Sequence, residues 1–179
     1  MAAMKSETRT KQILSVMHVL TWIAFIGLMI KTGALLVAYG VSYVNPEAAR
    51  NLYLGLDLYK LREASFWQYT QVVSFWVAFS GLKAYVLFLV ISALSEINLV
   101  NPFTLKVTRI LEKISHVLIG LWLVAVLYNA QSGWMEKRSG IVQEEWAVEG
   151  FFFMAGLVFI IAQIFKRGVE IQTENELTV

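Results

Sequence analysis

The apolar stretch around Lys83 constrains this chain more than any other feature. Residues Phe75–Ser95 contain a single charged side chain, Lys83, and are otherwise apolar, small or hydroxyl-bearing. A helix needs about 20 such residues to cross a hydrocarbon core of about 30 Å. The stretch therefore predicts a membrane-spanning helix over about 71–97, which the turn signal Asn101-Pro102 brings to an end.

The composition supports a membrane protein and excludes several kinds of site. Hydrophobic residues make up 58% of the chain and charged residues 16%, whereas soluble domains average about 45–50% and about 25%. There is no cysteine, which excludes disulfides, thiolate nucleophiles and cysteine-ligated metals. The formal net charge of +2 is too small to indicate direct binding of nucleic acid.

Three other apolar stretches are long enough to cross a membrane, and their spans are expected at about 13–37, 107–130 and 147–166. The four spans predict an all-α integral membrane protein, a four-transmembrane-helix bundle in which residues 1–179 form a single domain. The first stretch follows a basic start but lacks a small-residue cleavage site. We therefore expect a retained span rather than a signal peptide.

The third span is expected to be part of one continuous helix over about 102–130. Asn101 is a good N-cap, and Pro102 suits the first helical position because its missing N–H would have no helical partner there. Apolar residues then recur at helical spacing, with Lys106 and Arg109 on the other face. The pattern predicts an amphipathic first half and a spanning second half.

The two connections on the far side of the spans differ in character. Residues 39–69 hold the turn signal Asn45-Pro46 and an alternation of leucine with other residues over Leu52–Tyr59. This alternation predicts a short, half-buried strand, and the tyrosines and tryptophans nearby are typical of a membrane interface. We expect a small, ordered, extracytoplasmic cap here and a second outer loop over Asn129–Val148.

Four spans place both termini on one side of the membrane, and the basic residues indicate which side. Cytoplasmic segments of membrane proteins are enriched in Lys and Arg. The segments on the side of the termini carry the larger group, Lys5, Arg9, Lys11, Lys106, Arg109, Lys113, Lys166 and Arg167, and the others carry Arg50, Lys60, Arg62, Lys137 and Arg138. Both ends are therefore predicted to be cytoplasmic, in a multi-pass protein of the bacterial inner membrane.

Three short motifs make the chain resemble a known family. They are Asn101-Pro102-Phe103, the basic-Gly segment Phe165–Glu170, and the closing segment Glu174–Val179. Together they resemble the bacterial membrane family called domain of unknown function 2975, whose members typically end in an acidic E-N-D-L-T type motif. Glu176 stands where Asp is commoner. The resemblance covers essentially the whole chain in span number, loop order and length.

This resemblance implies little chemistry. The family has no established activity, so no catalytic residue is carried over to this chain. Its genes often lie beside a small helix-turn-helix regulator, which implies a membrane partner in gene control.

Lys83 is the first candidate for a functional side chain. A charge at mid-bilayer costs at least about 2.5–3.5 kcal/mol, and no acid lies at matching depth in the other spans. Lys83 is therefore expected to line a pocket inside the bundle, beside Ser80, or else to snorkel from a tilted helix. Both alternatives stay open.

Two further pairs are candidates from their depth in the spans. Lys31 and Glu149 fall near the outer ends of the first and last spans and would pair there, although two unpaired interfacial side chains fit equally. His18 and His116, the two histidines, lie on the first and third spans. Two facing histidines would ligate a haem iron axially, and the alternative is a pair of interfacial hydrogen-bonding side chains.

The end of the chain is a candidate for recognition by a partner. The segment Glu174, Asn175, Glu176, Leu177 and Thr178 is short, polar and predicted to be cytoplasmic. A partner protein would read it as a peptide, and the alternative is a disordered terminus.

These features favour a non-enzymatic membrane protein. There is no nucleotide-binding loop, no cluster of metal ligands and no nucleophile beside a base. We expect a regulatory or sensory component of the lipid bilayer that works with a cytoplasmic partner such as a small helix-turn-helix regulator, without a cofactor. Two alternatives are a small transporter or immunity-type protein that binds a ligand near Lys83, and a haem protein of electron transfer.

Overall fold

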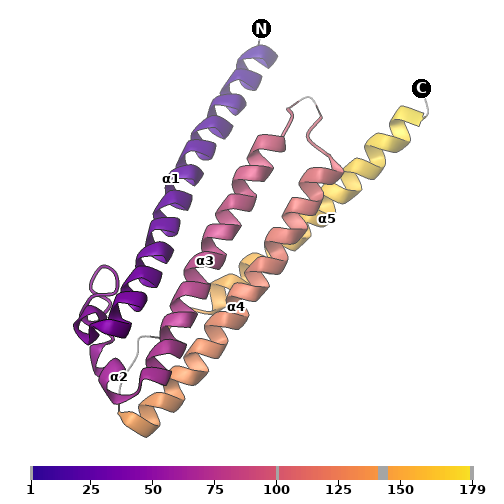
Figure 1. Ribbon diagram of the computed structural model, residues 1–179. Helices are drawn as coiled ribbons and strands as arrows, with labels where there is room; N and C mark the ends of the chain where they lie inside the picture. Colours follow the sequence, from indigo (N-terminus) through magenta and orange to yellow (C-terminus); the bar gives the residue numbers. More distant parts are fainter. Residues whose placement is uncertain (1, 100, 141–144, 178–179) are drawn as a thin grey trace. The chain divides into compact units, whose positions relative to one another are not determined.

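The computed structural model describes residues 2–99, 101–140 and 145–177, and these residues form α-helices and one 3₁₀ helix but no strand (Figure 1). The elements in chain order are α1 (Ala2–Val44), the 3₁₀ helix η1 (Pro46–Arg50), α2 (Tyr59–Ala64), α3 (Phe66–Glu96), α4 (Leu105–Ser139) and α5 (Glu149–Leu177). The all-α fold class is thereby confirmed for this part of the chain.

Within the described residues, four helices are long and apolar enough to cross a membrane. The candidate spans are Arg9–Val44, Phe66–Glu96, Leu105–Lys137 and Glu149–Glu174. Many large apolar side chains on them are exposed, such as Ile23 and Phe153, which is compatible with contact to lipid. The predicted number of spans is confirmed, and each helix extends past its predicted span at one end or both, because a helix does not have to end where the hydrocarbon ends.

The continuous helix expected after Asn101-Pro102 is present as α4, but its two ends differ from the predicted ones. The helix expected over about 102–130 begins at Leu105 and runs to Ser139, so the first part of the loop predicted over Asn129–Val148 is helical. Its N-terminal cap is Thr104, whose Oγ1 accepts a hydrogen bond from the Val107 amide at 3.3 Å. Asn101 instead bonds a side chain of α5, as described below.

The strand predicted over Leu52–Tyr59 is also wrong, because the chain turns back on itself in the middle of the alternation. Leu54 and Gly55 have positive φ angles of 47° and 88°, and the Leu52 amide donates a hydrogen bond to the Leu56 carbonyl at 3.0 Å. Leu52 and Leu58 are both 3% exposed, whereas Leu54 is 87% exposed. The alternating leucines therefore do not share one face of an extended strand.

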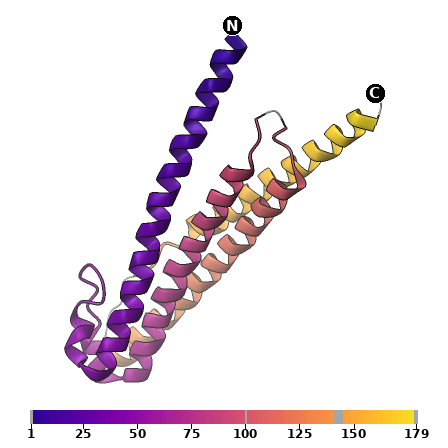
Figure 2. The ribbon, with the colours of Figure 1, turned by 45° about the horizontal axis from the view of Figure 1, so that its top comes forward.

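The contacts divide the chain into two compact units, and each is described by itself. The second unit comprises Ile26–Ala84 and Gly120–Glu149, and its core is built from α1, α3, α4 and residues 45–65. Residues 45–65, here called the 45–65 segment, include η1 and α2 and lie beside the last turns of α1 in both views (Figures 1 and 2). The core residues of this unit are Leu35, Ala49, Leu52, Leu58, Leu61, Tyr69, Val72, Val73, Tyr128 and Met135.

The 45–65 segment is therefore an ordered, packed part of the second unit. Asn45 caps η1 by accepting the Glu47 amide at 3.1 Å, and Pro46 occupies a position in the first turn of η1. Arg62 donates to the Ser42 carbonyl at 3.3 Å, and Leu61 is 1% exposed. These contacts attach both ends of the segment to the helices beside it.

The first unit comprises Met1–Phe25, Tyr85–Ile119 and Gly150–Val179. Its helices α4 and α5 pack closely because small residues lie between them: Ala155 is 2% exposed, and its carbonyl accepts a hydrogen bond from the Ser115 hydroxyl at 2.9 Å. Close approach through small residues and interhelical hydroxyl bonds is the usual way that helices associate in lipid.

Candidate functional site

The second unit contains a cluster of aromatic side chains drawn from α3, α4 and the connection that follows α4. The Trp146 ring stacks on Tyr128 with centroids 3.9 Å apart and on Phe79 at 4.2 Å, and it meets Trp76 edge to face at 5.2 Å. Such pairs stabilise a fold by about 0.5–1.5 kcal/mol each beyond the area they bury. We call Trp76, Phe79, Tyr128 and Trp146 the aromatic cluster.

One amide side chain holds Trp146 in this cluster. Asn129 donates from Nδ2 to the Trp146 carbonyl at 2.8 Å, and its Oδ1 accepts the Trp146 amide at 2.9 Å. Both backbone groups of Trp146 are therefore satisfied by a helix that is adjacent in space but 17 positions away in sequence. Sequence analysis marked residues 129–148 only as a loop and missed this contact.

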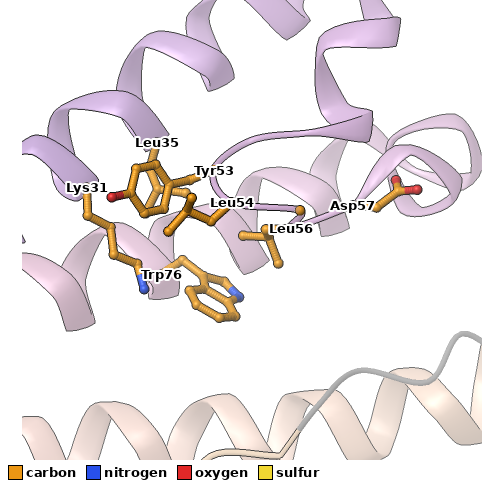
Figure 3. A pocket seen from close by; sticks show the side chains of 8 residues that line it. Lys31, Leu35, Tyr53, Leu54, Leu56, Asp57 and Trp76 are labelled. Atoms are coloured by element: carbon orange, nitrogen blue, oxygen red, sulfur yellow. The ribbon is translucent and has the colours of Figure 1, made fainter.

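Lys31 of α1 lies against the aromatic cluster. Its ammonium is 5.1 Å from the centroid of the Trp76 ring and 6.0 Å from that of Tyr53. Lys31 and Trp76, together with Leu35 and the turn Tyr53–Asp57, line a pocket of about 330 Å³. In Figure 3 the Lys31 side chain extends toward the indole of Trp76, while the carboxylate of Asp57 lies well away from the ammonium.

Lys83 of α3 also has an aromatic neighbour. It is half-buried, and its ammonium lies 4.1 Å from the centroid of the buried Phe79 ring. Ser80, predicted to lie beside it in a pocket, is 3% exposed and accepts a hydrogen bond from the Thr32 hydroxyl at 3.0 Å. Ser80 therefore joins α3 to α1, and Lys83 packs on the ring that Trp146 covers.

Lys31 and Lys83 both belong to the second unit, and each ammonium lies over an aromatic ring. A cation over an aromatic ring gains about 0.5–1 kcal/mol at an exposed site and about 2 kcal/mol when desolvated. A charge in the middle of a span costs at least about 2.5–3.5 kcal/mol. The aromatic faces thus offset part of the cost of these two charges.

The pair of Lys31 with Glu149 is not among the ion pairs of the described residues, and it stays a prediction. The ion pairs that the structure shows in its described residues are Arg50–Glu47, Lys106–Glu96 and Arg167–Glu170. Glu149 is exposed and is the first residue of α5, where a carboxylate complements the positive end of the helix dipole. Lys31 turns to the aromatic rings instead because the 45–65 segment brings Tyr53 to it.

His18 and His116 each have a hydrogen-bond partner in their own helix. His18 Nε2 accepts from the Trp22 indole at 3.0 Å, and His116 Nδ1 lies 2.6 Å from the Glu112 carbonyl oxygen. The two histidines line different pockets of the first unit, one with Lys11 and residues 94–99 and the other with Phe152 and Phe159. The structure gives no contact between them, and haem ligation stays a prediction.

The first unit holds a contact between the α3–α4 connection and the distal part of α5. The Phe103 ring meets Phe165 edge to face at 5.2 Å, and a Cβ on Gly168 would lie 2.6 Å from Phe103 Cδ1. Asn101 Oδ1 accepts a hydrogen bond from the Gln172 side chain. Two of the motifs that suggested the family resemblance therefore meet in space; we call this contact the Phe103–Gly168 junction.

The predicted partner-binding tail falls at the end of α5. Glu174 is exposed, and the backbone of Asn175, Glu176 and Leu177 is helical. Thr178 lies outside the described residues. The last apolar residue before the basic pair Lys166-Arg167 is Phe165, so the helix continues well past its apolar part.

Outside the candidate spans, hydrogen bonds change the acidity of three groups in the 45–65 segment. The Arg50 guanidinium donates to the Glu47 carboxylate and lowers its pKa. The same bond raises the pKa of Arg50. The Tyr59 hydroxyl donates to Glu63 at 2.7 Å, which raises the pKa of Tyr59.

Among the described residues, no group of three or more His, Asp or Glu side chains is arranged to hold a metal ion.

Comparison with known proteins gives one match. The model of the family described as "Protein of unknown function (DUF2975)" matches residues 45–179. The match includes all three motifs on which the resemblance rests, and it begins just after α1. No curated protein and no solved structure matches the chain.

Proposed function

The chain belongs to the DUF2975 family of proteins of unknown function, and we propose that it is a regulatory or sensory component of the bacterial inner membrane. It is a non-enzymatic, multi-pass protein with both termini in the cytoplasm. It acts by binding a cytoplasmic protein partner, such as a small helix-turn-helix regulator. Four apolar helices and the bias of basic residues support this placement.

The observation that carries the proposal is the Phe103–Gly168 junction. α5 does not end with its apolar part at Phe165 but continues as a helix to Leu177. Phe103 and Asn101 attach it to the α3–α4 connection through Gly168 and Gln172. A cytoplasmic partner that binds this helix would therefore bind an element whose position depends on the helices that cross the membrane.

The charge of the helix end favours a basic partner. Beyond the Arg167–Glu170 ion pair at 2.7 Å, the remaining charged residues, Glu174 and Glu176, are acidic. A DNA-binding regulator carries a basic face toward the phosphates, and complementary charge speeds and orients association. An acidic helix that binds that face would compete with DNA and so hold the regulator at the membrane.

The test is binding of the full chain to the helix-turn-helix regulator encoded beside its gene, measured by a two-hybrid assay in bacteria. We expect a positive signal that is lost when residues 173–179 are deleted. The variant Gly156→Ala is the matched control, because a Cβ there would meet nothing within 4 Å. Equal signals from the deletion variant and the control would overturn the proposal.

A second candidate function is a small transporter or immunity-type protein that binds a ligand near Lys83. The observation in its favour is the half-buried ammonium of Lys83 over the buried Phe79 ring. This candidate predicts that Lys83→Met abolishes the phenotype of the gene while binding of the regulator persists. The first candidate predicts that deletion of residues 173–179 abolishes both.

Haem-based electron transfer through His18 and His116 stays a prediction with no supporting contact. Ligation through His18 Nε2 would have to replace the hydrogen bond from Trp22. Absorbance of the purified protein near the Soret region tests it directly. A band that persists in the His116→Ala variant would exclude His116 as an axial ligand.

A further inference from the structure

The pocket beside Lys31 contains a cation, the Lys31 ammonium, that forms no ion pair with the described residues. This ammonium lies over Trp76 and Tyr53. Asp57 is the acid that lines the same pocket. Its Oδ1 accepts the Tyr59 amide at 2.9 Å, and its carboxylate lies away from the ammonium in Figure 3.

The other walls of this pocket combine polar groups with three leucines. Leu35 of α1 is fully buried, and Leu54 and Leu56 come from the turn of the 45–65 segment. Leu54 is 87% exposed although its neighbours Leu52 and Leu58 are buried. The turn thus places an apolar side chain at the rim of a cavity that has an ammonium inside it.

Trp76 contributes its indole ring to the wall. Figure 3 shows the indole nitrogen Nε1 on the side of the ring away from the Lys31 ammonium, and this buried nitrogen has no hydrogen-bond partner in the described part of the chain. The pocket therefore offers one cation and three leucines, and the acid in its described lining, Asp57, lies away from that cation.

We propose that this pocket binds an anionic amphiphile, with its carboxylate or phosphate on the Lys31 ammonium and its hydrocarbon chain against Leu35, Leu54 and Leu56. The volume of about 330 Å³ is at the lower end of ligand pockets, which span about 300–1,000 Å³. It accommodates a head group and the first methylenes, and the rest of the chain leaves past Leu54. A free inorganic anion would leave the leucines without a partner.

Two sources supply this chemistry, the head group of an acidic membrane lipid and a free fatty acid. Both present an oxyanion joined to an apolar chain. The site stands on its own contacts and does not depend on the partner proposed for α5, so the two proposals fail independently.

The first experiment titrates decanoate into the full chain in nanodiscs of phosphatidylcholine and measures heat of binding. We expect saturable binding that Lys31→Met weakens about tenfold or more, because a charge-assisted bond is lost. Lys31→Arg should bind nearly as the wild type does. Lys60→Met is the control, since it removes the same charge from an exposed position outside the pocket.

A second variant keeps the test valid if Lys31→Met fails to fold. Leu54→Asp replaces an exposed side chain at a positive φ that Asp tolerates better than Leu, and its carboxylate should repel decanoate from the pocket. Decanol, which has the same chain without the charge, should bind more weakly than decanoate by a similar factor. Equal binding of decanol and decanoate, or unchanged binding by Leu54→Asp, would overturn the proposal.

The second experiment separates the two sources. The chain is released from nanodiscs containing phosphatidylglycerol into the mass spectrometer under native conditions. A retained phosphatidylglycerol that Lys31→Met loses, and that decanoate displaces, identifies a lipid head group as the ligand. Decanoate binding without retained phosphatidylglycerol identifies a free fatty acid. Absence of both would show that the pocket binds neither.

Discussion

At the scale of single residues, two half-buried lysines lie against aromatic rings. Lys31 lies over Trp76 and Tyr53, and Lys83 lies over Phe79. Asn129 holds Trp146 against Phe79 by bonding both backbone groups of Trp146. The environment of each ammonium therefore includes the face of an aromatic side chain.

Replacing Lys83 tests whether the cost of its charge within the span exceeds the cation–π gain over the Phe79 ring. Lys83→Met should raise the free energy of unfolding by about 1 kcal/mol, because the cost of the charge exceeds the cation–π gain. Lys83→Glu should lower it, since a carboxylate would face the negative side of the Phe79 ring. Thermal unfolding of the purified variants in detergent measures both changes, and a Lys83→Met protein less stable than the wild type would contradict this balance.

The 45–65 segment should respond to acid. The pKa of Glu47 is lowered by the Arg50 guanidinium, so its stabilising contribution is complete above the ordinary value of 4.5 and is lost as the pH falls through the lowered value. We expect faster amide exchange in the segment, corrected for intrinsic rates, as the pH is lowered below about 4.5.

The control for this effect is Glu47→Gln, which should remove the pH dependence of exchange in the segment. Tyr59 responds to the opposite change in pH. Its pKa is raised, so its stabilising contribution is complete below the ordinary pKa of tyrosine and is lost as the pH rises through the raised pKa. A segment whose exchange changes equally in wild type and Glu47→Gln would show that other groups carry the response.

At the scale of elements, one glycine allows the end of α5 to pack against the α3–α4 connection. The Phe103 ring lies so close to Gly168 that a Cβ would meet Cδ1 at 2.6 Å and Cγ at 2.7 Å. The ring cannot leave this position without also leaving Phe165. The attachment of α5 to the α3–α4 connection therefore depends on the absence of a side chain at position 168.

Gly168→Ala should loosen the Phe103–Gly168 junction, and crosslinking can measure the change. The chain has no cysteine, so Asn101→Cys with Gln172→Cys provides a single pair at the site of a hydrogen bond. We expect a disulfide to form readily in this double variant and several-fold more slowly when Gly168→Ala is added, since an overpacked contact must shift.

Gly156→Ala in the same double variant is the control, because position 156 of α5 has open space around its Cβ. Its crosslinking rate should equal that of the double variant alone. A rate that Gly168→Ala leaves unchanged would mean that Phe103 moves aside without disturbing the helix.

At the scale of the whole molecule, four candidate spans and the positions of the basic residues predict a topology. An even number of spans puts both termini on one side, and the excess of Lys and Arg predicts that this side is the cytoplasm. Residues 45–65 are then expected outside the cytoplasm and residues 173–179 inside it.

Reporter fusions test this topology. Fusions after Lys11 and after Val179 should both report the cytoplasm, and a fusion within residues 51–57 should report the outside. A signal from the outside at either terminus would contradict the topology and would place the Lys31 pocket in the cytoplasm.

The sequence alone determined the all-α class, the four candidate spans and the family. The class and the spans depend on local composition, because about 20 apolar residues in a row have few alternatives to a helix in lipid. The family was indicated by the resemblance of three short motifs. The sequence also singled out Lys31, Lys83 and Ser80 from their chemistry. The sequence could not determine the helix ends. Thr104 rather than Asn101 caps α4, because the Asn101 side chain accepts a hydrogen bond from Gln172 of α5.

Tertiary structure alone decided which side chains meet. Leucine alternation predicted a strand at Leu52–Tyr59, but Leu54 and Gly55 turn the chain and bring Tyr53 to Lys31. That contact, rather than an ion pair with Glu149, sets the environment of Lys31. The periodicity of apolar residues contains information only about residues that are close along the chain. The environment of a charge depends on residues far away in sequence, which only packing brings within reach.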